Sequence, residues 1–197
     1  MILPLLLGTT AFLLYIVYDI NSYTLHNRVL NCSFWAGSMM LAAATMLLLI
    51  SAWQANAFSG PADIALVLLG AGFFILLLYC LFFALPFQET YVDQPQDRRV
   101  YDRGVYALCR HPGVLCFFAM YLFLGLAALP TRFLLNGMAY SLLNFLYVVF
   151  QDRITFPKTF CDYSEYQKKA PFIIPNKKSI CLAVQTWRQP TRKEDGK

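Results

Sequence analysis

The sequence is poor in charge. Only 14% of its 197 residues are charged, whereas 58% are hydrophobic. A soluble domain has about 25% charged and about 45–50% apolar residues. The chain therefore has too little polar material to cover a soluble globule, which excludes a disordered chain, a disulfide-rich secreted domain and most soluble enzymes. Its length suits one domain or one helical bundle.

The sequence also lacks the patterns of cysteine and histidine that are typical of metal sites and of disulfide frameworks. Its six cysteines include no Cys-x-x-Cys pair, and neither of its two histidines stands at metal-ligand spacing from a cysteine. We expect most cysteines to be small apolar fillers, with no metal site and no structural disulfide. Nothing in the sequence indicates binding to nucleic acid.

Long apolar runs make up most of the chain. A membrane helix needs about 20 mainly apolar residues. Barrel strands would alternate apolar and polar residues, which these runs do not. We predict an all-α polytopic membrane helical bundle of about five transmembrane helices, the first and fourth short. The five runs lack Asp, Glu, Lys and Arg, and they are Ile2–Tyr18, Leu30–Ile50, Ile64–Leu85, Gly113–Leu129 and Phe133–Phe150.

Lys and Arg are unevenly distributed among the connections. With the N-terminus outside, fifteen of the 16 Lys and Arg residues would lie in the cytoplasm and only Arg132 outside. This bias predicts a cytoplasmic C-terminus. The first run has no basic residues before it and no small-residue cleavage site, so we expect a permanent helix rather than a cleaved signal.

The chain divides into four parts of a single membrane domain, 1–197. Residues 1–85 hold the first three helices, 86–112 a cytoplasmic connector, 113–150 the last two helices and 151–197 a cytoplasmic tail. The connection Pro130-Thr131-Arg132 is so short that the last two helices should form a tight hairpin. That hairpin would bring Pro112 and Phe150 side by side.

Arg110 and His111 stand where the fourth helix begins. Pro112 suits the first turn of a helix because its missing N–H would have been unpaired there. The free N–H groups and positive dipole end of the helix favour an anion. The alternative is that Arg110 reaches lipid headgroups and His111 only caps the helix.

Asp152 follows the fifth helix and should lie opposite Arg110. A structural ion pair between the two is one interpretation, and a cofactor contact is the other. Further on, Phe160, Tyr163 and Tyr166 recur at helical spacing, which predicts a short cytoplasmic amphipathic helix ended by Pro171. Such a stripe packs against a bundle or lies in the membrane interface.

These two segments resemble the isoprenylcysteine carboxyl methyltransferase and phospholipid methyltransferase family of integral membrane enzymes. The resemblance covers about residues 104–175. The family's first motif is Gly-x-Tyr followed by Arg-His-Pro-x-Tyr-x-Gly. This chain differs from it at Val114, where the motif has Tyr, and at Cys116, where it has Gly. The second motif has a Glu-Glu pair, a Phe-Gly, two spaced tyrosines and a Pro-x-x-x-Pro. The matching residues are Gly104, Tyr106, Arg110, His111, Pro112, Phe160, Tyr163, Tyr166, Pro171 and Pro175.

The family's Glu-Glu pair is replaced in this chain. Counting back from Tyr163 puts Gln151-Asp152 at the pair, and counting back from Phe160 puts Asp152-Arg153 there. Only Asp152 keeps a carboxylate in both alignments. A side chain shorter than glutamate would weaken or move a cofactor contact at this position.

The resemblance implies methyl transfer from S-adenosylmethionine at the cytoplasmic membrane face. The acceptor would be lipidic or hydrophobic: a prenylcysteine carboxylate, a phospholipid amine or a small thiol. The expected catalytic residues are His111, as a base for an amine or thiol or as a cofactor contact, and Arg110. The expected cofactor-binding residues are Gly104, Tyr106, Arg110, His111, Pro112, Gln151, Asp152, Tyr163 and Tyr166.

Two alternatives stay open at this stage. A membrane reductase of the sterol-reductase type would use NADPH. Four connector arginines could meet its phosphates: Arg98, Arg99, Arg103 and Arg110. A non-catalytic relative would instead bind a lipid or a partner protein, as the replaced Glu-Glu pair suggests. A transporter or channel is less consistent, because such proteins place ionisable groups inside their spans.

Overall fold

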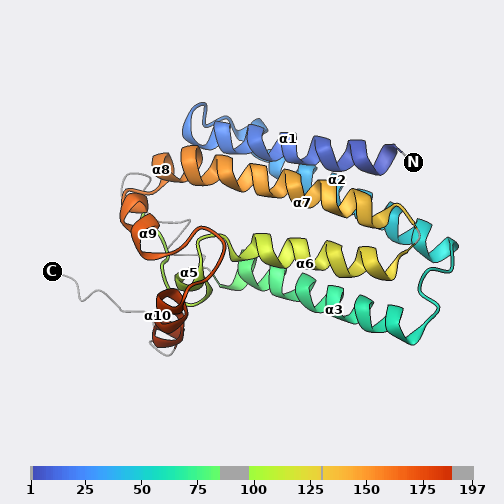
Figure 1. Cartoon of the computed structure of the whole chain (residues 1–197). Coiled ribbons are helices and arrows are strands. Elements are labelled where there is room, and N and C mark those ends of the chain that lie inside the picture. Colours follow the sequence, from blue (N-terminus) through green and yellow to red (C-terminus); the bar gives the residue numbers. More distant parts are fainter. Residues whose placement is uncertain (1, 85–97, 130, 188–197) are drawn as a thin grey trace.

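The fold is a bundle of long helices, antiparallel except for α1 (Leu3–Tyr23) and α7 (Phe133–Phe150), which run in the same direction, with shorter helices gathered at one end (Figure 1). It is seen in a computed structural model that describes residues 2–84, 98–129 and 131–187, and no strand occurs among them. The elements in chain order are α1 (Leu3–Tyr23), α2 (Arg28–Gln54), α3 (Pro61–Leu78), η1 (Tyr79–Phe83), α5 (Val105–Leu108), α6 (Pro112–Ala127), α7 (Phe133–Phe150), η2 (Gln151–Thr155), α8 (Phe156–Thr159), α9 (Tyr163–Lys169) and α10 (Lys177–Trp187).

Four of the helices are long and apolar enough to cross a membrane. They are α1, α2, α3 with its continuation through η1, and α7 with its continuation through η2 and α8. α6 has 16 residues and is about 24 Å long at 1.5 Å per residue, which is less than a hydrocarbon core of about 30 Å. The predicted all-α fold is thus confirmed for the described residues, with four helices of membrane-spanning length and apolarity and a shorter apolar helix beside them.

Several helices run further than the apolar pattern predicted, including α2, which extends beyond Leu30–Ile50 at both ends. α1 continues past Asp19 to Tyr23, and the helix that begins at Phe133 continues without a break to Thr159. Asp152 therefore lies within a continuous helix rather than in a tail that follows it. The apolar pattern stopped at the first strongly polar residue, Asp19 or Gln151, whereas the backbone hydrogen bonding of a helix continues through it. The predicted end of the third span, Leu85, lies outside the described residues.

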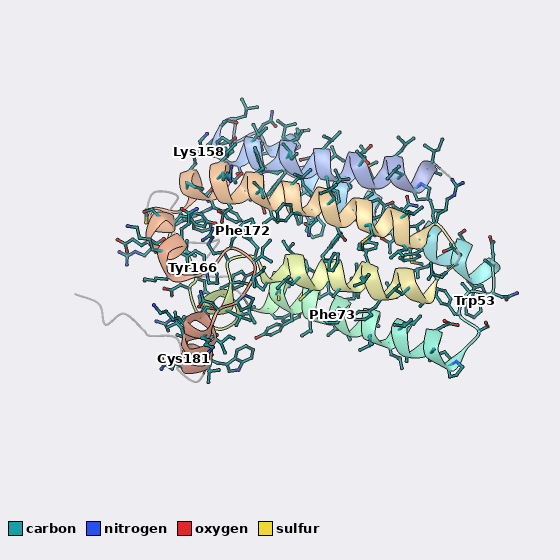
Figure 2. The ribbon with its side chains drawn as sticks, in the orientation of Figure 1. Trp53, Phe73, Lys158, Tyr166, Phe172 and Cys181 are labelled. Atoms are coloured by element: carbon teal, nitrogen blue, oxygen red, sulfur yellow. The ribbon has the colours of Figure 1, made fainter. Side chains whose placement is uncertain are left out.

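The helices lie in the order α2, α1, α7, α6, α3 across the bundle, each against the next (Figure 1). Buried aromatic rings fill the centre: Tyr121 of α6 and Tyr140 of α7 meet edge to face, with ring centroids 5.5 Å apart. On the outer side, Phe73 of α3 stacks on Phe123 of α6 at 5.6 Å (Figure 2). Many aliphatic side chains on the outward faces are exposed, as expected for helices that contact lipid.

Gly125 allows α6 and α7 to approach closely. A Cβ at this position would lie 2.7 Å from the Cα atom of Leu134 on α7. Small residues commonly permit such close backbone packing between membrane helices. Residue 130 of the predicted hairpin connection lies outside the described part of the chain, so the structure describes the packing of the two helices and not their whole connection.

The short helices α5, α8, α9 and α10 lie together at one end of the bundle, and the N-terminal end of α1 lies at the other (Figure 1). Trp53 marks the far end, whereas Tyr166 and Phe172 lie toward the end with the short helices (Figure 2). Lys158 of α8 lies 4.3 Å above the ring of Tyr23, which ties this end to α1. The polar candidate residues are therefore held at a single end.

Candidate functional site

Three of the predicted site residues contact the carboxylate of a fourth, Asp152. Arg110 donates from Nε to Oδ1 at 2.8 Å and from Nη2 to Oδ2 at 3.0 Å. His111 Nε2 lies 3.0 Å from Oδ1, and the Tyr163 hydroxyl donates to the same oxygen at 2.5 Å. Gln167 adds a longer bond of 3.3 Å to Oδ2. We call Arg110, His111, Asp152, Tyr163 and Gln167 the Asp152 cluster.

Arg110 also fastens the segment that follows α9. Its Nη1 donates to the carbonyl oxygens of Gln167 and Ala170, at 3.1 and 2.9 Å. Its backbone N–H donates to the carbonyl of Pro171 at 2.9 Å, and that of His111 donates to Phe172 at 3.3 Å. The guanidinium thus joins α6, η2 and α9, which are distant in sequence.

The Asp152 cluster is shielded from solvent. The side chains of Arg110 and Asp152 are 11% and 8% exposed. The ring of His111 stacks on Phe156 at 5.8 Å and meets Phe172 edge to face at 5.2 Å. A two-point Arg–carboxylate pair in such surroundings is much stronger than an exposed one, and either partner alone would be a buried unpaired charge.

Burial shifts the titration of the groups around Asp152. The pKa of His111 is lowered, because burial disfavours the imidazolium more than the neighbouring Asp152 favours it. The pKa of the Tyr163 phenol is raised by burial and by its bond to Asp152. At neutral pH the imidazole is therefore neutral with a proton on Nε2, and both rings donate to the carboxylate.

Local backbone structure explains how these side chains are aimed. Pro112 is the first residue of α6, as predicted, so His111 and Arg110 precede the helix with non-helical backbone. Asp152 lies in the π-helical turn η2, where one extra residue per turn shifts the following side chains around the axis. Gln151 and Asp152, as consecutive residues of a helix, point in different directions and contact different neighbours.

Tyr106, Tyr166 and Gly104 form a layer beside the Asp152 cluster. The Tyr166 hydroxyl donates to the carbonyl of Tyr106 at 2.7 Å, and the Tyr106 hydroxyl donates to the carbonyl of Cys80 at 2.8 Å. Burial raises the pKa of Tyr166. Gly104 has a φ of +57°, which favours glycine, and its N–H donates to Thr186 of α10. These predicted residues brace α5 against its neighbours.

Gln151 faces a second buried polar group that the sequence did not reveal. Its Nε2 donates to the Tyr147 hydroxyl at 2.8 Å, and the carboxylate of Asp19 on α1 neighbours Gln151, Tyr147 and Thr155. Asp19 and Thr155 are each 4% exposed. Among the described residues, Asp19 Oδ2 and Thr155 Oγ1 are buried and have no hydrogen-bond partner within ordinary distance, although the Thr155 hydroxyl lies beside the carboxylate. We call Asp19, Tyr147, Gln151 and Thr155 the Asp19 group.

The predicted amphipathic helix is shorter than its aromatic pattern indicated. α9 begins at Tyr163, and Phe160 precedes it in extended backbone. Tyr163 and Tyr166 are nevertheless buried together, with Phe160 and Phe156 packed against them. The aromatic pattern correctly predicted a common buried face, but it did not predict that the helix is interrupted between Phe160 and Tyr163. A short turn can place its side chains on the same face as the helix that follows it.

The two polar groups differ in what they can still bind. The Asp152 carboxylate already has five donors at its two oxygens, so it acts first as a structural ion pair. The Asp19 carboxylate retains a buried oxygen that can accept a donor, and a hydroxyl lies beside it.

Comparison with protein-family models, with curated proteins and with solved structures finds no match for this chain.

Proposed function

We propose that the chain transfers methyl groups from S-adenosylmethionine to a lipidic acceptor at the cytoplasmic face of a membrane. The supporting observation is the junction of the two motif segments: Arg110 and His111 from the first meet Asp152 and Tyr163 from the second in one hydrogen-bonded cluster. The same residues stand at the end of apolar helices, where a lipid could bring its reactive group.

The charges at this end fit the amino-acid part of S-adenosylmethionine. This cofactor supplies an activated methyl group on a sulfonium. Its ammonium would be held by Asp19 and Thr155, whose buried oxygens each lack a partner within ordinary distance among the described residues and suit a cationic donor. Its carboxylate would accept from the remaining Nη2 N–H of Arg110, whose other four N–H groups are already donated. Asp19 would thereby make a cofactor contact of the kind that the resemblance implied for Asp152.

The chain's own residues would orient the reactants and exclude water. Asp152 and Tyr163 fix Arg110 and His111, and Phe156 and Phe172 cover the imidazole. Positioning and exclusion of water supply much of the acceleration of a displacement reaction. For an amine or thiol acceptor, neutral His111 can take the proton; a carboxylate acceptor needs no base.

Calorimetric titration of the detergent-solubilised protein tests the proposal. We expect saturable binding of S-adenosylmethionine and none of NADPH at the same concentrations. Asp19→Asn should weaken this binding at least about 10-fold, since an ion pair with a buried ammonium is worth about 1.5–3 kcal/mol. Asp102→Asn, which removes a charge from an exposed side chain at the same end, should bind as the wild type does.

A second candidate function is favoured because both carboxylate oxygens of Asp152 already accept hydrogen bonds from the protein. In that case the Asp152 cluster only ties the tail to α6, and the protein is a non-catalytic lipid-binding or partner-binding relative. Folded protein that binds neither S-adenosylmethionine nor NADPH would favour this candidate. Preference for NADPH would instead favour the reductase alternative, with the connector arginines as phosphate ligands.

A further inference from the structure

α10 has three distinct faces, although nothing in the apolar runs predicted this helix. Ser179 and Ala183 are buried against the rest of the molecule. Ile180, Val184 and Trp187 form an apolar stripe beside them, and their side chains are 48%, 58% and 61% exposed. The remaining face is polar and exposed, and it includes Lys178 and Gln185. We call Ile180, Val184 and Trp187 the α10 stripe.

The α10 stripe borders a groove between α10 and α5. The groove has a volume of about 340 Å³, and its lining is entirely apolar: Leu108, Ile180, Ala183, Val184 and Trp187. Each methylene group removed from water into such a lining contributes about 0.8 kcal/mol. This apolar lining suits a hydrocarbon chain.

The α10 stripe is continuous with the membrane-spanning surface. The ring of Trp187 stacks on Tyr79 at 6.4 Å, and Tyr79 lies within the span Pro61–Phe83. Leu81, Phe82 and Phe83, which follow in that span, are 51%, 52% and 76% exposed. Trp187 thus lies at the depth where a lipid-facing helix ends, which is the level that Trp favours in membrane proteins.

Charge at the start of α10 indicates the headgroup that accompanies the hydrocarbon. Lys177 and Lys178 are exposed there, and each cation near an anionic membrane surface contributes about 1 kcal/mol. We propose that α10 lies in the membrane interface and that its groove with α5 holds an acyl chain of an anionic phospholipid of the surrounding bilayer. This inference does not depend on methyl transfer.

Quenching of Trp187 fluorescence tests the proposal. The full chain is reconstituted into vesicles of phosphatidylcholine and phosphatidylglycerol, and the Trp187 signal is taken as the difference between wild type and Trp187→Phe. Lipids brominated near the glycerol end of the acyl chains should quench this signal by at least about half, as expected for a ring at the interface. Acrylamide from the aqueous phase should quench it weakly.

A matched pair of variants separates the α10 stripe from the polar face. Val184→Glu places a charge on the stripe, so it should reduce quenching by brominated lipid at least about twofold and increase quenching by acrylamide. Gln185→Glu places the same charge on the neighbouring polar position and should change neither.

Two outcomes would overturn the proposal. Strong acrylamide quenching of wild-type Trp187 without lipid quenching would place α10 in water. Protection from both quenchers would show that another protein, or a second copy of this chain, covers the stripe. Folding is followed separately by the helical signal in circular dichroism, so loss of structure is not mistaken for either outcome.

Discussion

Asp152 is the residue on which the polar contacts between α6, η2 and α9 converge. Its two oxygens accept from Arg110, His111, Tyr163 and Gln167, while its side chain is only 8% exposed. A buried charge with this many partners is tolerated, whereas the same charge with its main partner removed is costly. The position therefore tests the structural role of the cluster separately from any ligand.

Asp152→Asn should destabilise the protein strongly, by about 3–5 kcal/mol in the free energy of unfolding, because it leaves the Arg110 guanidinium buried without a counter-charge. Asp102→Asn should change it by less than about 0.5 kcal/mol, because Asp102 and Lys169 are paired at 3.4 Å and are 41% and 55% exposed. Denaturant unfolding in detergent measures both. Equal effects of the two variants would contradict the importance of the buried pair.

His111 should make the protein less stable in mild acid. Burial lowers its pKa in the folded chain, whereas an unfolded histidine has a pKa of about 6.5. Below that pH the unfolded chain binds more protons, so the free energy of unfolding falls as the pH drops through the window below about 6.5. His111→Gln, which keeps a donor for Asp152, should lose part of this dependence between about pH 7.5 and about pH 5.5.

Thermal unfolding at several pH values compares wild type with His111→Gln. The other histidine, His26, is exposed in the turn between α1 and α2, and it is present in both proteins. If the variant loses as much stability in acid as the wild type does, His111 is not the group that titrates.

The sequence could predict the meeting of Arg110 and Asp152 but not the environment of Gln151. Arg110 and Asp152 are oppositely charged residues at adjoining ends of two apolar runs, so their pairing follows from helix length and proximity. Asp19 was visible only as the charge that ended the first run. That it neighbours Gln151 depends on the packing of α1 against η2, and a single sequence does not carry that information.

At the scale of elements, the apolar runs predicted where the long helices lie, but they predicted the helix ends less well. All five runs correspond to helices, yet α1 and α7 continue through charged residues at the membrane boundary. α10 was not predicted, because apolar, small and polar residues alternate along its sequence and the mean hydropathy of the segment is therefore not high. η2 has no clear sequence signal either, since a π-turn reflects packing on both sides of the helix.

The contact between α6 and α7 at Gly125 should be sensitive to a single methyl group. Gly125→Ala places a Cβ 2.7 Å from the Leu134 Cα, so the helices must separate, at a cost of about 1–3 kcal/mol. Gly72→Ala in α3 is the matched control, because a Cβ there meets nothing within 4 Å. Thermal unfolding should show a lower midpoint for Gly125→Ala alone, and equal midpoints would contradict the close packing.

At the scale of the whole molecule, charge and fold agree on which end is distinct. The end with α5, α8, α9 and α10 carries most of the basic residues, and the N-terminal end of α1 lies opposite (Figure 1). A reporter enzyme fused after Lys197 should therefore be active only in the cytoplasm. The same reporter inserted at Asn56, between α2 and α3, should be active only on the other side. Reversed signals would overturn the orientation.

The most direct test of a cofactor site at this end is ultraviolet cross-linking of radiolabelled S-adenosylmethionine, followed by mapping of the labelled peptides. We predict saturable label, displaced by unlabelled S-adenosylmethionine, in peptides that contain Tyr106, Tyr147 or Phe156, whose aromatic rings lie at or beside the two polar groups. Label confined to the opposite end, near Trp53, or label that unlabelled S-adenosylmethionine does not displace, would contradict the proposed function.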